Sequence, residues 1–258
     1  MGAFPALLIG RRPVRCRCLV VYRVDPRAVE RLLPEKLRVR SVLGRAIVAV
    51  CYTRLGTPVL FGRQTLFRRR ASAEGGSDHL AYRFAVERED GSAATWIARR
   101  ETSSWLEARC GAKLLGGEFG RSAFQVKEDA FGIELAVAGE RGESFYLRAE
   151  TAPATHGSLF PSPQALAAFL GAHQPVRPYD VFAPEADELD LAEHFAPTPL
   201  AVFEARAAFL SAEPFAPGAA ELDSAWRIAS RRMAPVASVR PAFRVLPDPG
   251  SSPALPTG

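Results

Sequence analysis

Lysine is scarce in this sequence of 258 residues. Of its 33 basic residues, only Lys36, Lys113 and Lys127 are lysines, and all the others are arginines. Arginine has GC-rich codons and lysine has AT-rich codons, so the composition of the genome accounts for much of this bias. The formal net charge of +5 is therefore weak evidence for a nucleic-acid partner. Because no nucleic-acid-binding motif accompanies the charge, we expect no nucleic acid as a ligand.

Cysteine and histidine are also few, and their spacing does not suit a metal site. Cys16 and Cys18 form a Cys-x-Cys pair, but no second pair follows it, and a structural zinc site takes four ligands. Cys16 and Cys18 are also too close in sequence for a comfortable disulfide. We therefore expect no metal, no cofactor and no disulfide, with the thiols free in a reducing compartment. The other cysteines and the histidines are dispersed: Cys51, Cys110, His79, His156, His173 and His194.

Long apolar runs are missing as well. No run approaches the roughly 20 residues that a helix needs to span a bilayer. Residues 1–12 place their charges after the apolar residues, which is the reverse of a secretory signal. We expect a soluble, cytoplasmic protein with no membrane partner, and the sequence leaves its oligomeric state open.

Short segments with strand-forming patterns fill most of the chain. Hydrophobic residues make up 48% of the sequence, which is enough for a sizeable core. The segments predict a single β-rich α+β domain with a few short helices and with sheets that curve or close into a barrel. The expected strands are Cys16–Val24, Leu37–Val42, Ala46–Tyr52, Leu80–Val86, Ala94–Ala98, Ser122–Lys127, Ile133–Ala138, Phe145–Thr151 and Ala201–Leu210.

The middle of the chain predicts a hairpin followed by a helix. Asp90-Gly91 between two strand patterns is a strong hairpin signal, and it places Trp96 on the inner face, opposite the strand Leu80–Val86. Ser104-Trp-Leu-Glu107 matches a capping box, in which the Ser and Glu side chains each satisfy an amide at the helix start. A helix over Trp105–Leu115 follows, and Gly116-Gly117 ends it.

Several segments, taken in their order, resemble the YqjF-like branch of the acetoacetate decarboxylase-like superfamily. The resemblance spans roughly residues 15 to 235 and implies a closed, cone-like antiparallel β-barrel with an apolar pocket. We therefore expect an N-terminal extension over 1–14, a single closed barrel domain over 15–240 and a disordered, proline-rich tail over 241–258. The segments are Val24-Asp-Pro, Leu32-Leu-Pro-x-x-Leu37, Gly44-Arg-Ala46, Arg99–Ser104, Gly111–Gly117, Gly157–Ser162, Ala168–Leu170 and Glu221–Ala225.

The resemblance directs attention to lysine chemistry, and here the sequence departs from the family. Acetoacetate decarboxylase forms a Schiff base through a lysine, and its pattern is an Arg-Glu pair followed closely by two adjacent lysines. This sequence has Arg100-Glu101, but the next lysine is Lys113, which is followed by Leu114. We therefore predict that paired-lysine decarboxylation is absent.

Lys113 and Glu101 are the candidate catalytic residues. Lys113 is a nucleophile if burial or a nearby cation lowers its pKa; otherwise it is a surface lysine near a helix end. Glu101 is a general acid or base, or else it forms a plain ion pair with Arg99 or Arg100 or is a carboxylate at a helix start.

The candidate ligand-binding residues are Arg100, Trp96, Trp105 and Arg121. The forked guanidinium of Arg100 matches a carboxylate, unless Arg100 is only an exposed strand end. The two tryptophans form the wall of a pocket or belong to an ordinary core, and Arg121 supplies a second cation. We expect the barrel to bind or act on a small organic acid, such as a keto acid. The alternative is a non-catalytic ligand-binding or interaction barrel.

Overall fold

One large sheet dominates the fold. The computed structural model describes residues 14–56, 59–60, 63–64, 76–115, 118–140, 142–155, 157–160, 162–171, 174–175, 197–215 and 218–228. Thirteen strands join in this sheet, as the β-rich pattern predicts. The expected tail over 241–258 and residues 1–13 of the expected extension lie outside the described residues, and the first strand already begins at Val14.

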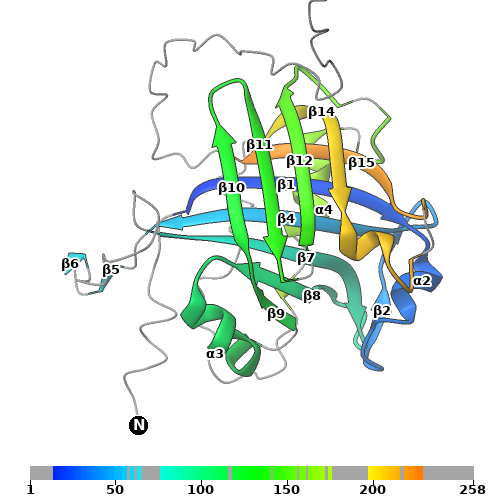
Figure 1. Ribbon diagram of the computed structural model, residues 1–258. Coiled ribbons are helices and arrows are strands. Elements are labelled where there is room, and N and C mark those ends of the chain that lie inside the picture. The colour runs from blue at the N-terminus through cyan, green and yellow to red at the C-terminus, as the bar shows by residue number, and fades with distance from the viewer. Residues whose placement is uncertain are drawn as a thin grey trace, which may run out of the picture.

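Nine of these strands follow one another as antiparallel neighbours in the order β10-β11-β12-β14-β15-β1-β4-β7-β8. In Figure 1, β10, β11, β12 and β14 run across β1, β4 and β7, so the sheet curls around a common interior. The strands are β1 (Val14–Val24), β4 (Arg45–Gly56), β7 (Gly76–Arg88), β8 (Ala93–Thr102), β10 (Ala123–Glu128), β11 (Gly132–Gly139), β12 (Gly142–Thr151), β14 (Pro197–Ala207) and β15 (Glu221–Ile228).

The two ends of this order meet at a seam. β8 pairs in parallel with β9 (Glu118–Arg121), and after Ser122 the chain continues directly into β10. The Ser122 amide donates a hydrogen bond to the Thr102 carbonyl oxygen, 3.0 Å away. Parallel neighbours need a crossover connection, and α3 (Trp105–Leu115) supplies it between β8 and β9. The barrel is therefore nearly closed and its sheet is mixed, which corrects the expectation of a closed, wholly antiparallel barrel.

The remaining strands are short. β2 pairs with β7, and β3 pairs with β4. β13 pairs with β8 in parallel, and β5 and β6 form a separate two-stranded sheet. Their bounds are β2 (Leu37–Val39), β3 (Ser41–Val42), β5 (Val59–Leu60), β6 (Arg63–Gln64) and β13 (Gln174–Pro175).

Polar side chains cap the start of two short helices. In α2 (Pro26–Glu30), the Asp25 side chain accepts a hydrogen bond from the Arg27 amide at 2.9 Å. In α4 (Pro163–Gly171), Ser162 Oγ accepts one from the Ala165 amide at 3.1 Å. A 3-10 turn, η2, spans Ala208–Ser211. Among the described residues, no helix has the length and apolar character required to cross a membrane.

The helix α3 has the predicted bounds, but its capping box is only half formed. Ser104 Oγ accepts a hydrogen bond from the Glu107 amide at 3.4 Å, as expected. The Ser104 amide donates to Thr102 Oγ1 at 3.1 Å instead of to the Glu107 carboxylate. That carboxylate accepts from Thr102 Oγ1 at 3.2 Å and lies 3.1 Å from His79 Nε2. Glu107 therefore ties α3 to β7 and β8.

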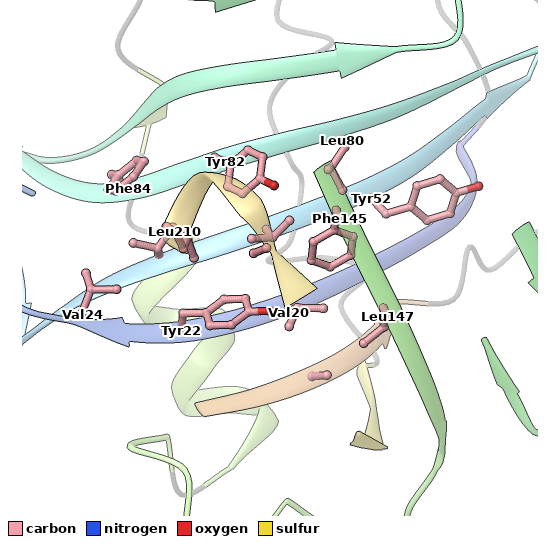
Figure 2. Close-up of a cluster of buried hydrophobic side chains, with 14 of the residues drawn as sticks. Val20, Tyr22, Val24, Tyr52, Leu80, Tyr82, Phe84, Phe145, Leu147 and Leu210 are labelled. Carbon is pink, nitrogen blue, oxygen red and sulfur yellow. The ribbon is translucent and has the colours of Figure 1, made fainter. Parts of the chain in front are cut away.

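Strand alternation divides the core into an inner and an outer cluster. The inner cluster lies on the inner face of the barrel, and Figure 2 shows Tyr22 of β1, Tyr82 of β7 and Phe145 of β12 within it. The outer cluster lies on the opposite face of β1, β4 and β15, where Leu166 of α4 packs with Trp226. Full burial of one such large side chain contributes roughly 1.5–3 kcal/mol.

Candidate functional site

A β-bulge in β8 decides which of its side chains face the barrel interior. Tyr82 on β7 pairs with Arg99, but the next residue, Arg83, pairs with Ile97. Ala98 is therefore an extra residue in β8. Side chains alternate along a strand, so one inserted residue exchanges the faces of all that follow.

The residues paired with β8 show this exchange. Before the bulge, Trp96 lies opposite Phe84, and their ring centroids are 5.5 Å apart in the inner cluster. After the bulge, Arg99 lies opposite Tyr82, and Glu101 lies opposite Leu80. Both of these β7 residues belong to the inner cluster, so Arg99 and Glu101 face inward.

The same register places Arg100 on the outer face. It pairs with Ala81, which lies between the inward residues Leu80 and Tyr82 on β7. Its guanidinium carbon lies 5.4 Å from the ring centroid of Phe119 on β9. The structure therefore does not bring Arg100 together with Glu101 and Trp96, and Arg99 takes the inward position.

The Glu101 carboxylate is buried, with 1% of the residue exposed. Its Oε2 atom accepts hydrogen bonds from Ser122 Oγ at 2.8 Å and from Ser144 Oγ at 2.6 Å. The Ser144 hydroxyl has the Val137 carbonyl as a second acceptor at 3.1 Å. Ser122 lies at the seam, between β9 and β10, and Ser144 lies on β12. Side chains from strands far apart in the order of the sheet therefore meet at the carboxylate of Glu101 on β8.

Arg99 forms an ion pair with the other carboxylate oxygen. Arg99 Nε lies 3.1 Å from Glu101 Oε1, but within the described part of the chain neither atom makes a hydrogen bond. The Arg99 side chain is 29% exposed, whereas that of Glu101 is 1% exposed. The guanidinium therefore extends from a buried carboxylate to a region that solvent reaches.

Two tyrosines complete the polar part of the interior. Tyr82 donates its hydroxyl proton to the Ser144 carbonyl oxygen at 3.1 Å. Burial raises the pKa of Tyr82; the charge of Glu101 and the presence of Tyr22 raise it further, while Arg99 opposes the shift. Burial also raises the pKa of Tyr22, whose hydroxyl oxygen has no hydrogen-bond partner among the described residues.

The other expected site residues lie away from this interior. Trp105 on α3 is 58% exposed, and the Arg109 guanidinium lies 5.9 Å from its ring centroid. Arg121 is exposed and pairs with Thr102 at the seam. Of the residues expected to bind a ligand, only Trp96 lies in the inner cluster.

Lys113 belongs to α3, and its side chain lies outside the described part of the structure. Glu107 of this helix contacts His79 on β7. His79 alternates with the inward residues of β7, so this contact lies on the outer face of the sheet. The backbone that carries Lys113 and the carboxylate of Glu101 thus lie on opposite sides of β8.

The sequence interpretation gave five residues of the interior no role in binding or catalysis, and it named Arg99 only as a possible ion-pair partner of Glu101. They share no local motif, since they come from β1, β7, β8, β12 and the seam. The alternation in the sequence predicts Arg100 rather than Arg99 on the face of Trp96, and nothing local indicates the bulge. The missed residues are Tyr22, Tyr82, Arg99, Ser122 and Ser144.

The described residues contain no group of three or more potential metal ligands. Cys18 and Cys51 are buried free thiols, and Cys110 is a partly buried one. Burial raises the pKa of the Cys18 thiol, which keeps it in the unreactive protonated form.

No protein-family model matches the sequence, and no curated protein matches it either. Solved structures do resemble the fold. Acetoacetate decarboxylase from Legionella pneumophila is 8% identical, with a TM-score of 0.42 over 56% of this chain and 51% of that one. An acetoacetate decarboxylase-like enzyme from Sphingomonas wittichii is 16% identical, with a TM-score of 0.41 over 53% and 55% of the two chains.

The enduracididine biosynthesis enzyme MppR, in complex with pyruvate, is 12% identical, with a TM-score of 0.41 over 55% of this chain and 56% of its own. The chain spans about half the length of each of these three. The YqjF-like branch stays a prediction from the sequence.

Proposed function

We propose that the barrel interior binds a small organic acid, such as a keto acid, and that Arg99 binds its carboxylate. The observation that carries this proposal is the pair of a buried carboxylate and a partly exposed guanidinium on the same inner strand face. Because Glu101 lies beside Nε, it orients the guanidinium. The terminal nitrogens make no hydrogen bond with the described residues and can form a bidentate pair with a ligand carboxylate.

Trp96 packs on the buried ring of Phe84 and supplies an apolar surface next to this charge. The rings of Trp96 and Phe84 contact each other on the inner face. Phe84 lies two residues along β7 from Tyr82, which pairs with Arg99. Small-molecule sites in proteins combine such apolar walls with a few polar groups that fix the orientation of the ligand. Glu101 is the candidate acid or base of a reaction on that ligand.

A non-catalytic binding barrel is the second candidate, and the positions of the lysines favour it. Lys36 and Lys127 are exposed, and Lys113 belongs to the helix on the outer face of β8. Schiff-base chemistry through a lysine beside Glu101 is therefore not part of the proposal. Binding of an acid without any turnover would identify the protein as a binding barrel.

The test compares two adjacent arginines on opposite faces of β8. Isothermal titration calorimetry measures the affinity for pyruvate, acetoacetate and butyrate in the wild type, Arg99→Gln and Arg100→Gln. A hydrogen bond to a charged group is worth about 1.5–3 kcal/mol, so Arg99→Gln should weaken binding at least tenfold. Arg100→Gln should stay within about twofold of the wild type.

Far-ultraviolet circular dichroism checks that both variants keep their β structure. The proposal fails if no acid binds to the wild type, or if Arg99→Gln binds the acids as tightly as Arg100→Gln does.

A further inference from the structure

The inner face of the barrel carries a cluster of aromatic rings around Phe84. The ring centroids of Trp96, Phe209 and Phe215 lie 5.5, 6.3 and 6.3 Å, respectively, from that of Phe84. Figure 2 shows Phe84 on β7 and, near it, Leu210, which follows Phe209 in η2. Side chains from β8 and from η2 therefore pack on the same ring of β7.

These rings differ in how far water reaches them. Phe84 and Phe215 are 0% and 1% exposed. Trp96 and Phe209 are only half-buried, although both pack against the inner cluster. Apolar surface that stays in contact with water is unfavourable, and a second apolar surface would cover it. The two half-buried rings are therefore the part of the cluster that a ligand can contact.

The strand register places these two rings beside Arg99. Arg99 lies opposite Tyr82, and Trp96 lies opposite Phe84, two residues further along β7. The ring centroid of Phe209 is 4.9 Å from that of Tyr82 and 6.3 Å from that of Phe84, so Phe209 contacts both β7 residues. Two residues of a strand span about 7 Å. One small ligand can therefore place a carboxylate at Arg99 and an apolar group against the two half-buried rings.

The orientation of the rings indicates what kind of apolar group suits them. Aromatic rings attract one another most when they are tilted or edge-on. The Trp96 ring is inclined at 47° to that of Phe84. The Phe209 ring is inclined at 74° to the same ring and at 48° to that of Tyr82. An aliphatic group would gain burial alone, whereas an aromatic group would also extend these tilted contacts.

We propose that the organic acid bound in the interior carries an aromatic ring, which packs against Trp96 and Phe209 while Arg99 binds the carboxylate. The inference rests on the proposed function of the same interior and narrows its ligand class. Trp96 and Phe209 then determine specificity for the ring, and Arg99 determines affinity for acids in general.

Calorimetry with propionate, 3-phenylpropionate and 3-cyclohexylpropionate tests this inference. The three acids share a carboxylate and differ only in the group on the third carbon. A single methylene in an apolar site is worth about tenfold or more in affinity, so the wild type should bind 3-phenylpropionate at least tenfold more tightly than propionate. It should also prefer 3-phenylpropionate to 3-cyclohexylpropionate, because only the aromatic ring forms the tilted contacts.

Two variants each remove one ring and keep an apolar side chain. Phe209→Leu and Trp96→Leu should each lower the affinity for 3-phenylpropionate about fivefold and leave that for propionate within about twofold. Phe131→Leu, at a position between β10 and β11 that is 56% exposed, is the matched control and should keep the wild-type affinities. Far-ultraviolet circular dichroism checks the fold of each variant. Because the two rings belong to different elements, either variant tests the inference if the other does not fold.

The outcomes distinguish this inference from the function on which it rests. If all three acids bind with equal affinity and Arg99→Gln weakens all of them, the organic-acid site stands and the aromatic preference is overturned. If 3-cyclohexylpropionate binds as tightly as 3-phenylpropionate, the ligand class is apolar rather than aromatic, and the inference is wrong. If both ring variants keep the wild-type preference for 3-phenylpropionate, the role of the two rings is overturned. If no acid binds, the proposed function fails and this inference fails with it.

Discussion

At the scale of single residues, Glu101 shows what a buried charge requires. Transferring a carboxylate from water to the interior costs several kcal/mol unless other groups replace its hydration. Here two serine hydroxyls bind one oxygen, and the Arg99 guanidinium lies beside the other. The sequence identifies Glu101 as a candidate, but its partners Ser122 and Ser144 are 21 and 43 residues away.

Removal of the Ser144 hydroxyl should destabilise the fold. Ser144→Ala deletes a 2.6 Å hydrogen bond to a buried carboxylate, and hydrogen bonds to charged groups contribute about 1.5–3 kcal/mol. We expect the free energy of unfolding to fall by about 2 kcal/mol in urea denaturation. Ser41→Ala, at an exposed position on β3, should change it by less than about 0.5 kcal/mol. Equal effects of the two substitutions would contradict this account of Glu101.

At the scale of elements, the bulge at Ala98 has the largest consequence. The sequence predicts a strand that ends at Ala98, whereas β8 continues to Thr102. The extra residue turns Arg99 inward and Arg100 outward, so the site depends on one irregular backbone position. Bulges of this kind commonly redirect a side chain toward a functional site.

A second element-scale feature is the close packing of α3 on β9. A Cβ atom at Gly111 would lie 2.4 Å from the Phe119 ring, which is closer than such atoms can approach. Alanine is favoured over glycine inside helices by about 1 kcal/mol, yet we expect Gly111→Ala to lower the melting temperature. The steric conflict at the helix–strand contact should outweigh the gain in helix propensity.

A double-mutant cycle checks the cause of this effect. In a Phe119→Ala background, Gly111→Ala should become neutral or stabilising, because the ring that it would collide with is gone. An unchanged cost in that background would show that the contact with Phe119 is not responsible.

At the scale of the whole molecule, the barrel separates α3 from the interior. The helix contacts the outer face of the sheet through Glu107 and His79, whereas Glu101 lies inside. A lysine that forms a Schiff base needs a pKa about three units below its usual value, which corresponds to roughly 4 kcal/mol. Such a shift requires burial or a close cation near the Lys113 amine.

We therefore predict that the protein does not decarboxylate acetoacetate at an appreciable rate. The measurement is incubation with acetoacetate or pyruvate, reduction with borohydride, and mass spectrometry of the intact chain. We expect no stoichiometric adduct, and an authentic acetoacetate decarboxylase treated in parallel is the positive control. An adduct on Lys113 that disappears in Lys113→Ala would contradict the prediction and establish lysine chemistry in this protein.

The sequence by itself determined the local structure of this protein. The hairpin at Asp90-Gly91 and the bounds of α3 follow from interactions between residues a few positions apart, so their patterns are visible in the chain. The β-rich class follows from alternation in the same way. Only the tertiary structure decided that the sheet has a mixed seam and that Arg99 rather than Arg100 faces the interior with Glu101. These features depend on register between distant strands, which is set by how the whole sheet packs, and local alternation does not record it.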